Sequence, residues 1–410
     1  MSNALLNPSV IAKESLMQLK NQLRFGKLAH REYKQEFVKV GDTVTIRKPV
    51  KFYTADGATR VNQDVEEGST SIVINQRKHV SWAFSTQDLT LTIDEYSERY
   101  IKPAMITLAQ TVDSYGAALY KNLWNSVGTP GTTPANYAAV AAASQRATEM
   151  AVPTSDRKAV LNSAAFHTIA ATLTTLNMPQ MAMKAWESGE IGNLAGFQTF
   201  ESINLKNHTT GARGGTPLVN GASQNVTYAA SKTTNTQTLN VDGASNSITG
   251  WAKAGDVFTI AGVYAVNPVP GEGTTGKTVM SYLQQFTVTA DADSSGAGAV
   301  ALTISPAIIT SGPYQTVSAA PADNAALTFL GTAATAYPQN MCFHKNALAL
   351  VTCPLELPDG AAWKERATDD GLSVRIVKDY DIDSDSDVIR ADILFGWKAI
   401  YPDLGVRLWG

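Results

Sequence analysis

Residues 94–128 read DEYSERYIKPAMITLAQTVDSYGAALYKNLWNSVG, and this stretch predicts the longest helix of the chain. Asp94 is a suitable N-cap, and Glu95 and Glu98 place acidic charge where the helix dipole favours it. An apolar stripe with helical spacing follows, made of Leu108, Val112, Tyr115, Leu119 and Leu123. Gly128, followed by Pro130, predicts the end of the helix.

Pro103 interrupts this stretch and indicates either a kink or a second helix start. From Pro103 to Val127 the helix would span about 25 residues, or roughly 37 Å. Helices in globular domains average about three turns, so this one is expected to act as a spine on which other segments pack.

Length and charge limit the function classes. A chain of 410 residues suggests two or three domains, and a net charge of −3 gives no global argument for nucleic-acid binding. Residues 1–60 differ, because eleven Lys and Arg face five acids, a net of +6. This segment is either a solvated surface or an arm that faces a polyanion or an acidic partner.

Cysteine content and hydropathy exclude several further classes. Cys342 and Cys353 are the only cysteines, so no zinc-ligand spacing exists and a reducing cytosolic compartment is expected. The start, MSNALLNPSVIAKES, lacks the apolar core of a signal peptide. No apolar run approaches the ~20 residues of a membrane span.

The first 84 residues predict a short helix and an extended ribbon. Ser9–Leu23 has a loose apolar face with few core positions, which indicates an arm that docks on something else. Val38–Phe84 reads as a two-limbed β-ribbon, with turns near Asp56-Gly57 and Glu66–Ser69. Because a two-stranded ribbon is only marginally stable alone, we expect it to lie on another subunit.

After the spine the sequence alternates between helices and strands, which predicts α+β or α/β structure. The expected elements are helices at Pro134–Met150 and Ser163–Leu176 and strands at Lys158–Leu161 and Phe197–Ile203.

Residues 214–338 change in composition, with nine charged residues among 125, and suggest a small all-β barrel inserted within another domain. Its expected strands are Thr238–Val241, Asp256–Val263, Gln285–Ala290, Val300–Ile304 and Ala326–Leu330. Beyond it, strands are predicted at Phe343–Val351, Leu372–Asp379, Ile389–Gly396 and Val406–Trp409.

Two motifs resemble ligand-binding sites, one for nucleotides and one for calcium. Gly271–Thr278 matches the P-loop pattern, but the expected buried strand before it and helix after it are missing, so a surface loop of the barrel is favoured. Alternate aspartates between Asp379 and Asp387 lack the Gly and Glu of an EF-hand, and a solvated turn is favoured.

The histidines and nucleophiles form no catalytic pattern. The five histidines at 30, 79, 167, 208 and 344 are scattered, and no H-E-x-x-H, G-x-S-x-G or Cys/His cluster is present. No catalytic, cofactor or metal site is predicted, and the chain is expected not to be an enzyme.

The order of parts resembles that of tailed-bacteriophage major capsid proteins with the Hong Kong-97 fold. Glu187–Phe197, ending at Glu201-Ser202, resembles a turn and strand common in these proteins. More specifically, AGDVFTIAGVYAVNP, VNPVPGEGTTG, LQQFTVTAD and MCFHKNALALVTCPLELPDG resemble the short-tailed phage coat subfamily that carries an extra β-barrel domain. The resemblance covers essentially the whole chain and is strongest from about Asp256 onward.

The resemblance implies an α+β capsid fold in five parts. They are an N-terminal arm (1–37), an extended β-ribbon (38–84), the spine with peripheral and axial domains (85–213), an inserted barrel (214–338) and a return to the peripheral and axial domains (339–410). It also implies hexamers and pentamers of an icosahedral virion shell, made in the bacterial host cytoplasm. The implied partners are a scaffolding protein, a portal and packaged double-stranded DNA. One departure concerns the acidic barrel loop that can bridge capsomers, because Ser231–Gln237 has no acid here.

The basic arm would then face scaffold or DNA inside the shell, through Lys20, Arg24 and Lys27. Charge reversal at these residues that left assembly and DNA retention unchanged would refute this hypothesis. Two alternatives are an encapsulin-like protein cage, which the inserted barrel disfavours, and a P-loop nucleotide hydrolase acting through Lys277.

Overall fold

The computed structural model describes residues 8–31, 43–55, 57–63, 65–85, 97–173, 191–269, 277–369, 371–382 and 386–410. The chain divides into two compact units. Unit 1 comprises Met1–Thr45, Ser71–Ala117 and Leu348–Lys398, and unit 2 comprises Ile46–Thr70, Ala118–Ala347 and Ala399–Gly410. Mixed helices and strands make the chain α+β, as the sequence predicts.

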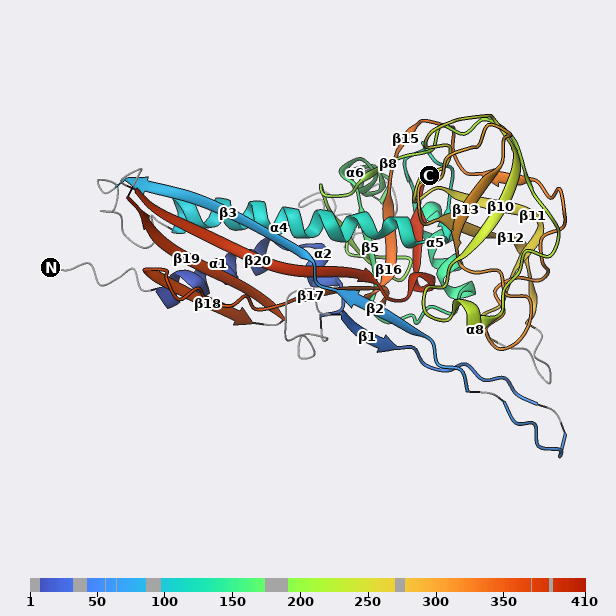
Figure 1. Cartoon of the computed structure of the whole chain (residues 1–410), viewed down its shortest axis with the longest axis horizontal. Coiled ribbons are helices and arrows are strands. Elements are labelled where there is room, and N and C mark those ends of the chain that lie inside the picture. Colours follow the sequence, from blue (N-terminus) through green and yellow to red (C-terminus); the bar gives the residue numbers. More distant parts are fainter. Residues whose placement is uncertain are drawn as a thin grey trace. The chain divides into compact units, whose positions relative to one another are not determined.

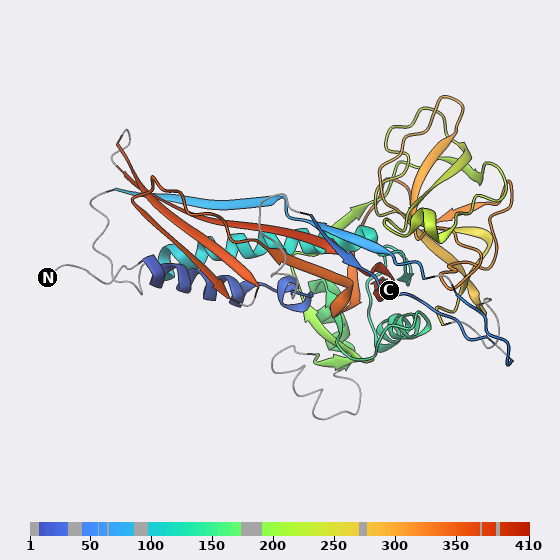
Figure 2. The same cartoon turned by 60° about the horizontal axis from the view of Figure 1, so that its bottom comes forward.

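Unit 1 is a five-stranded sheet with two helices on one face (Figures 1 and 2). Its strands are β3 (Gln76–Ser85), β17 (Leu348–Thr352), β18 (Trp363–Asp369), β19 (Leu372–Asp381) and β20 (Ser386–Ala399). The helices α1 (Pro8–Gln22) and α4 (Lys102–Ala117) contribute to one hydrophobic core with the buried side chains of β19 and β20. The apolar side chains that alternate along the strands and those that recur every 3.6 residues along the helices therefore pack in the same core.

The predicted spine helix is confirmed in its middle and shorter at its C-terminal end. A π-helical turn, Ser97–Ile101, directly precedes α4, and Pro103 is the second residue of α4. A 3-10 turn, Ala118–Asn122, follows, and Ser126–Val127 is a strand, β4. The prediction of helix up to Val127 was wrong, because Asn, Ser and Val are weak helix formers and Val127 pairs with the C-terminal strand. Asp94, the predicted cap, lies outside the described residues.

The predicted arm helix exists, but it is part of the core of unit 1. Leu16, Leu19 and Leu23 are buried, while Val10 is 45% exposed and Ile11 takes its place in the core. The expectation of few core positions was therefore wrong, because α1 packs on α4, β18 and β19 of its own unit. Residues 1–7 and 32–42 lie outside the described residues.

Asp113 of α4 fixes the short helix α2 (Phe25–Leu28). Its carboxylate accepts the backbone N–H groups of Arg24 (2.6 Å) and Gly26 (3.1 Å), which would otherwise lack partners at the start of α2. Burial raises the pKa of Asp113 to about 6, although these N–H groups oppose the shift. The end of the arm is thus tied to the spine helix.

The ribbon differs from its prediction in how the second limb pairs. β1 (Thr43–Arg47) pairs with β2 (Ser69–Val73), but β3 leaves the ribbon and pairs with β20 over ten residue pairs. The prediction that the second limb of the ribbon continues to Phe84 was wrong, because the Val80 and Trp82 side chains pack against the hydrophobic core of unit 1. The two sides of the loop between β1 and β2 are joined by hydrogen bonds. The Lys48 N–H donates to Gly68 O (2.7 Å), and the Gln63 side chain bonds to the backbone N–H and C=O of Tyr53.

Unit 2 contains a mixed six-stranded sheet in the order β4-β21-β16-β5-β7-β6. The strand bounds are β5 (Arg157–Leu161), β6 (Asn193–Leu194), β7 (Phe197–Glu201), β16 (Asn340–His344) and β21 (Gly405–Leu408). Helices α5 (Tyr137–Glu149) and α6 (Ser163–Leu173) pack on its core. Asn136 caps α5, which begins at Tyr137 and not at the predicted Pro134. α6 begins at the predicted Ser163, and Asn162 accepts the Ala165 N–H in its first turn.

The predicted strand Phe343–Val351 is two strands in different units. β16 ends at His344, a 3-10 turn spans Lys345–Ala347, and β17 begins at Leu348. All the residues of both strands are buried, and the polar residues His344, Lys345 and Asn346 stand where the first strand ends and the turn begins. Cys342 lies in β16 and Cys353 follows β17, and both are buried free thiols.

Residues 214–338 form a six-stranded antiparallel sheet within unit 2, in the order β14-β11-β12-β13-β10-β9. The five predicted strands are confirmed, as β10 (Gln237–Ala244), β11 (Val257–Val266), β12 (Val279–Val288), β13 (Val300–Ser305) and β14 (Leu327–Phe329). β9 (Gly215–Val219) was not predicted, since it has little alternation. An antiparallel bridge between Leu218 and Ala326 links the two edges of the sheet.

Three further short elements complete unit 2: β8 (Asn207–Thr209), β15 (Ala336–Pro338) and α8 (Tyr228–Ser231). β8 and β15 pair with each other at the two ends of residues 214–338. These ends therefore lie side by side, which is the arrangement expected of a segment inserted between neighbouring strands. Among the described residues, none of the helices has the length and apolarity needed to span a bilayer.

Candidate functional site

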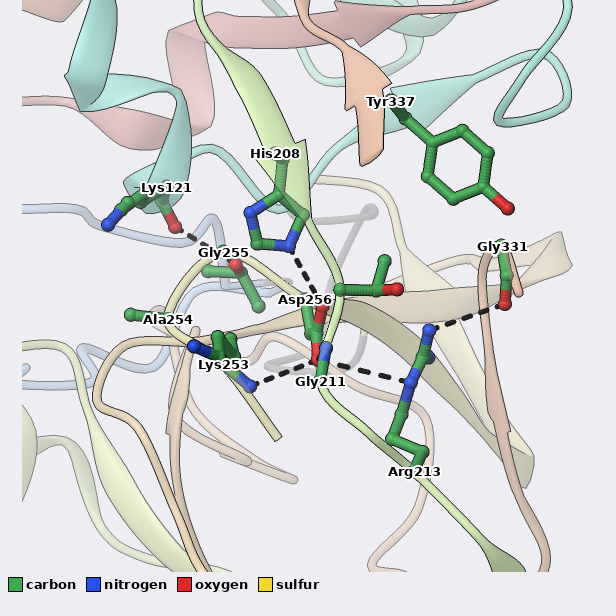
Figure 3. A network of polar contacts seen from close by, with 12 residues as sticks. Lys121, His208, Gly211, Arg213, Lys253, Ala254, Gly255, Asp256, Gly331 and Tyr337 are labelled. Carbon is green, nitrogen blue, oxygen red and sulfur yellow. Dashed lines mark hydrogen bonds and ion pairs between the residues drawn. The ribbon is translucent and has the colours of Figure 1, made fainter. Parts of the chain in front are cut away.

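A buried polar cluster in unit 2 surrounds Asp256 (Figure 3). Asp256 immediately precedes β11 and is 2% exposed. Its carboxylate accepts hydrogen bonds from His208 Nε2 (2.8 Å), Gly211 N–H (3.0 Å) and Lys253 N–H (3.1 Å). Because His208 lies on β8 and Asp256 lies within residues 214–338, the carboxylate joins that segment to the strand before it.

His208 is held by both ring nitrogens. Its Nδ1 lies 3.0 Å from the Tyr120 hydroxyl, and its Nε2 faces the carboxylate. An acceptor-only carboxylate requires a proton on Nε2, and in the neutral ring with that proton Nδ1 accepts the Tyr120 hydroxyl proton. Burial raises the pKa of Tyr120 to about 12, so this hydroxyl stays protonated.

Opposing influences act on the ionisation of Asp256. Burial alone would raise its pKa, but the hydrogen bond from His208, the charge of Arg213 and two backbone N–H groups together hold the pKa below its ordinary value. The carboxylate is therefore charged at neutral pH and its charge is compensated within the cluster.

Two arginines complete the cluster, which we call the junction network (Tyr120, His208, Arg213, Asp256 and Arg407). Arg213 Nε lies 4.0 Å from Asp256 Oδ2, and its guanidinium stacks over the Phe329 ring. Arg407 of β21 donates to Gly255 O (2.6 Å) and to Thr287 Oγ1 (3.2 Å). Burial lowers the pKa of Arg407 to about 10, which leaves it charged at neutral pH.

The junction network is arranged to hold segments together. The Tyr–His–Asp order could in principle relay a proton, but the cavity in unit 2 is not lined by any of these five residues. The carboxylate oxygens are already bonded to protein donors, and so is each ring nitrogen of His208. The geometry therefore supports a structural joint. One weak signal for this joint is visible in the sequence, since Asp256 is among only nine charged residues in 214–338.

The three basic residues predicted to contact a polyanion lie on the α1–α2 segment of unit 1. Lys20 Nζ pairs with Asp369 Oδ2 at 2.6 Å, on the protein surface. The side chains of Arg24 and Lys27 are exposed. Partial desolvation and repulsion from Arg24 and Arg31 lower the pKa of Lys27. An exposed ion pair of this kind contributes little to stability.

The P-loop match is not followed by the helix that it requires. Residues 271–276 lie outside the described residues, and the motif leads into the strand β12 after Lys277 and Thr278. Phosphates are cradled by a helix N-terminus in a P-loop, so a strand directly after the motif does not fit a nucleotide site. Lys277 itself is buried.

The acidic run is divided between two strands. Asp379 and Asp381 are exposed on β19, and Asp387 lies on β20. Asp383 and Asp385 lie outside the described residues. Among the described residues no group of three or more His, Cys, Asp or Glu is arranged to hold a metal ion.

Comparison with known proteins identifies the family of this chain. The family model described as P22 coat protein, gene protein 5, matches residues 3–410. The chain belongs to the P22 coat protein family. This confirms the predicted resemblance to the coat proteins of tailed phages, and the chain is accordingly a phage major capsid protein with a structural role and not an enzyme.

Relatives of this coat protein include the major capsid protein of Acyrthosiphon pisum secondary endosymbiont phage 1. It is 25% identical over 391 residues, which cover 90% of this chain and 89% of the relative. Among solved structures, one from Mycobacterium phage Che8 has a TM-score of 0.47 and 16% identity, covering 94% of this chain and 90% of that one. The capsid of Ralstonia phage GP4 has a TM-score of 0.44 and 8% identity, covering 93% and 87%.

Proposed function

We propose that this coat protein assembles, with a scaffolding protein, into hexamers and pentamers of an icosahedral shell that encloses the double-stranded DNA genome of a tailed phage. The shell also carries a portal, and the subunits are made in the cytoplasm of the bacterial host. The observation that carries the proposal is the match to a phage coat family over residues 3–410.

We further propose the five-part Hong Kong-97 arrangement for this chain, with an arm (1–37), a ribbon (38–84), a spine with peripheral and axial domains (85–213), an inserted barrel (214–338) and a return (339–410). In support, a helix-covered long sheet forms unit 1 and a mixed sheet forms part of unit 2. The Leu218–Ala326 bridge between the edges of the 214–338 sheet supports a barrel.

The loop between β1 and β2 carries the chemistry of a subunit interface. Phe52, Val61 and Val65 are 57%, 50% and 63% exposed, although each is a large apolar side chain. Exposed apolar side chains that gather on one segment are typical of a protein–protein contact. We infer that this loop lies on a neighbouring subunit, which gives the heterologous contacts that rings and shells require.

A triple substitution tests this function. In Phe52→Ser/Val61→Ser/Val65→Ser the subunit should fold normally, because these side chains are exposed, but shells should be reduced at least about tenfold. The measurement is velocity sedimentation and electron microscopy after expression with the scaffolding protein, with circular dichroism to establish folding.

The matched control is Thr54→Ser/Thr59→Ser/Asn62→Ser, three exposed polar residues on the same loop. This variant should assemble like the wild type. Normal assembly of the apolar triple variant would contradict the inferred contact.

The arm residues Lys20, Arg24 and Lys27 are proposed to face scaffold or DNA inside the shell. Their support is the net positive charge of residues 1–60 and the exposed side chains of Arg24 and Lys27. Interior binding of this kind is electrostatic and independent of DNA sequence.

A further inference from the structure

Unit 2 contains a half-open cavity of about 180 Å³, and Lys277 of the P-loop-like motif is among its lining residues. Its walls come from the base of the β1–β2 loop, from the 214–338 segment and from residues near Trp124 and Tyr401. Stacked Tyr228 and Tyr314 rings, 3.5 Å apart, form part of the wall. The Tyr314 hydroxyl accepts the Lys51 N–H (3.0 Å) and donates to Glu66 O (3.0 Å), so the loop is fixed over the cavity.

The charge of this lining is strongly unbalanced. Four lysines line the cavity, against one carboxylate, Asp403, among the described residues. They are Lys48, Lys51, Lys232 and Lys277. A concave surface with this excess of cations attracts anions, since low-dielectric walls strengthen the field inside it.

Lys277 shows that the site is more than a group of surface lysines. Lys277 is only 7% exposed, and its ammonium group donates a hydrogen bond to Gln315 O at 2.9 Å. Among the described residues this oxygen is its single acceptor, so two of its three donors remain for a ligand. Burial, and then repulsion from Lys51, lower its pKa to about 7, which is the response of an amine that lacks a counter-ion.

The size of the cavity decides the class of anion. Drug-sized ligands occupy pockets of roughly 300–1,000 Å³, and a water molecule takes about 30 Å³. A cavity of about 180 Å³ lies below this range and has room for a tetrahedral oxyanion with a few waters.

We propose that this cavity, which we call the lysine cavity, binds one small oxyanion of the phosphate class through Lys277, assisted by Lys51 and Lys232. The anion would supply the charge that the lining lacks and would connect the β1–β2 loop to the 214–338 segment. This proposal stands on unit 2 alone and does not depend on the shell.

Isothermal titration calorimetry of the full-length chain with inorganic phosphate, near pH 7, tests it. We expect saturable binding of one phosphate per chain, and a loss of at least about tenfold in affinity in Lys277→Met. Because the bound anion favours the charged amine, Lys277 should take up protons on binding, on top of any proton that phosphate itself releases; the uptake is detected as a difference between wild type and Lys277→Met in how the heat changes with the ionisation enthalpy of the buffer. This uptake should disappear in Lys277→Met.

Lys253→Met is the matched control, since that side chain is exposed in the same segment and does not line the cavity. It should bind phosphate like the wild type. If circular dichroism shows that Lys277→Met does not fold, Lys51→Met/Lys232→Met replaces it, and weaker binding is again expected.

Absence of saturable binding up to about 20 mM phosphate would overturn the proposal, as would unchanged affinity in a folded Lys277→Met chain. A single-stranded oligonucleotide that binds at Lys277 where inorganic phosphate does not would also overturn it, because the ligand would then be a phosphate backbone and not a small anion.

Discussion

Asp256 illustrates how a single residue can hold several segments together. Its buried carboxylate takes hydrogen bonds from β8, from Gly211 and from the turn before β11. A buried charge is tolerated only where donors surround it, so removing the carboxylate leaves buried donors without partners.

Asp256→Ala should therefore lower the free energy of unfolding by about 3–5 kcal/mol at neutral pH. Chemical denaturation of the full-length chain measures this. Asp242→Ala, a half-buried residue of β10 in the same segment, is the control and should change stability by less than about 1 kcal/mol.

The pH dependence of the same variant has a definite sign. The pKa of Asp256 is held below its ordinary value of 3.8 in the folded chain, so its stabilisation is present above that value and is lost as the pH falls through the folded pKa. The difference between wild type and Asp256→Ala should then shrink in acid. A difference that stayed constant from neutral pH to about pH 2 would contradict this account.

Single residues were the hardest scale to predict from sequence. The apolar stripe of the spine gave Leu108 and Val112 correctly, because burial follows helical spacing. The junction network could not be predicted, since His208 and Asp256 are far apart in sequence and only the fold brings them together. Lys277 stands out in the sequence only as part of a P-loop match, whereas its burial depends on contacts that the fold alone creates.

At the scale of elements, the contact between α4 and β20 is set by Gly116. A Cβ at this position would come within 2.7 Å of the Trp397 ring. The Trp397 indole N–H donates to Val112 O at 2.9 Å, which fixes the ring on the helix. The glycine is thus needed for close packing, although glycine is a poor helix former.

Gly116→Ala should consequently destabilise the chain by about 1–3 kcal/mol, because overpacking outweighs a propensity gain of about 1 kcal/mol. Thermal unfolding measures the change. Thr107→Ala, on the exposed side of the same helix, should leave stability nearly unchanged or raise it slightly. If both substitutions stabilised the chain, the packing argument would be wrong.

Element types were predicted better than element partners. The five strands of 214–338 were visible from alternation and turn residues, and the structure has all of them. The ribbon shows the limit of this reasoning. Alternation in Gln76–Ser85 predicts a strand, but it does not say that the partner is β20, which follows about three hundred residues later.

The whole molecule divides into two units whose boundaries cut across the order of the sequence. Unit 1 takes three separate stretches of chain, and so does unit 2. The predicted single strand Phe343–Val351 spans one of these boundaries, which explains why periodicity could not divide it. Whole-chain resemblance identified the family where local patterns identified only the elements.

Shell assembly is the central claim, and imaging of assembled particles tests it most directly. The full-length chain, expressed with and without its scaffolding protein, is separated by velocity sedimentation and examined by cryo-electron microscopy. The account predicts closed shells of uniform diameter, built of hexamers and pentamers. A folded chain that remained a monomer or a small ring under every condition, even with the scaffolding protein, would contradict it.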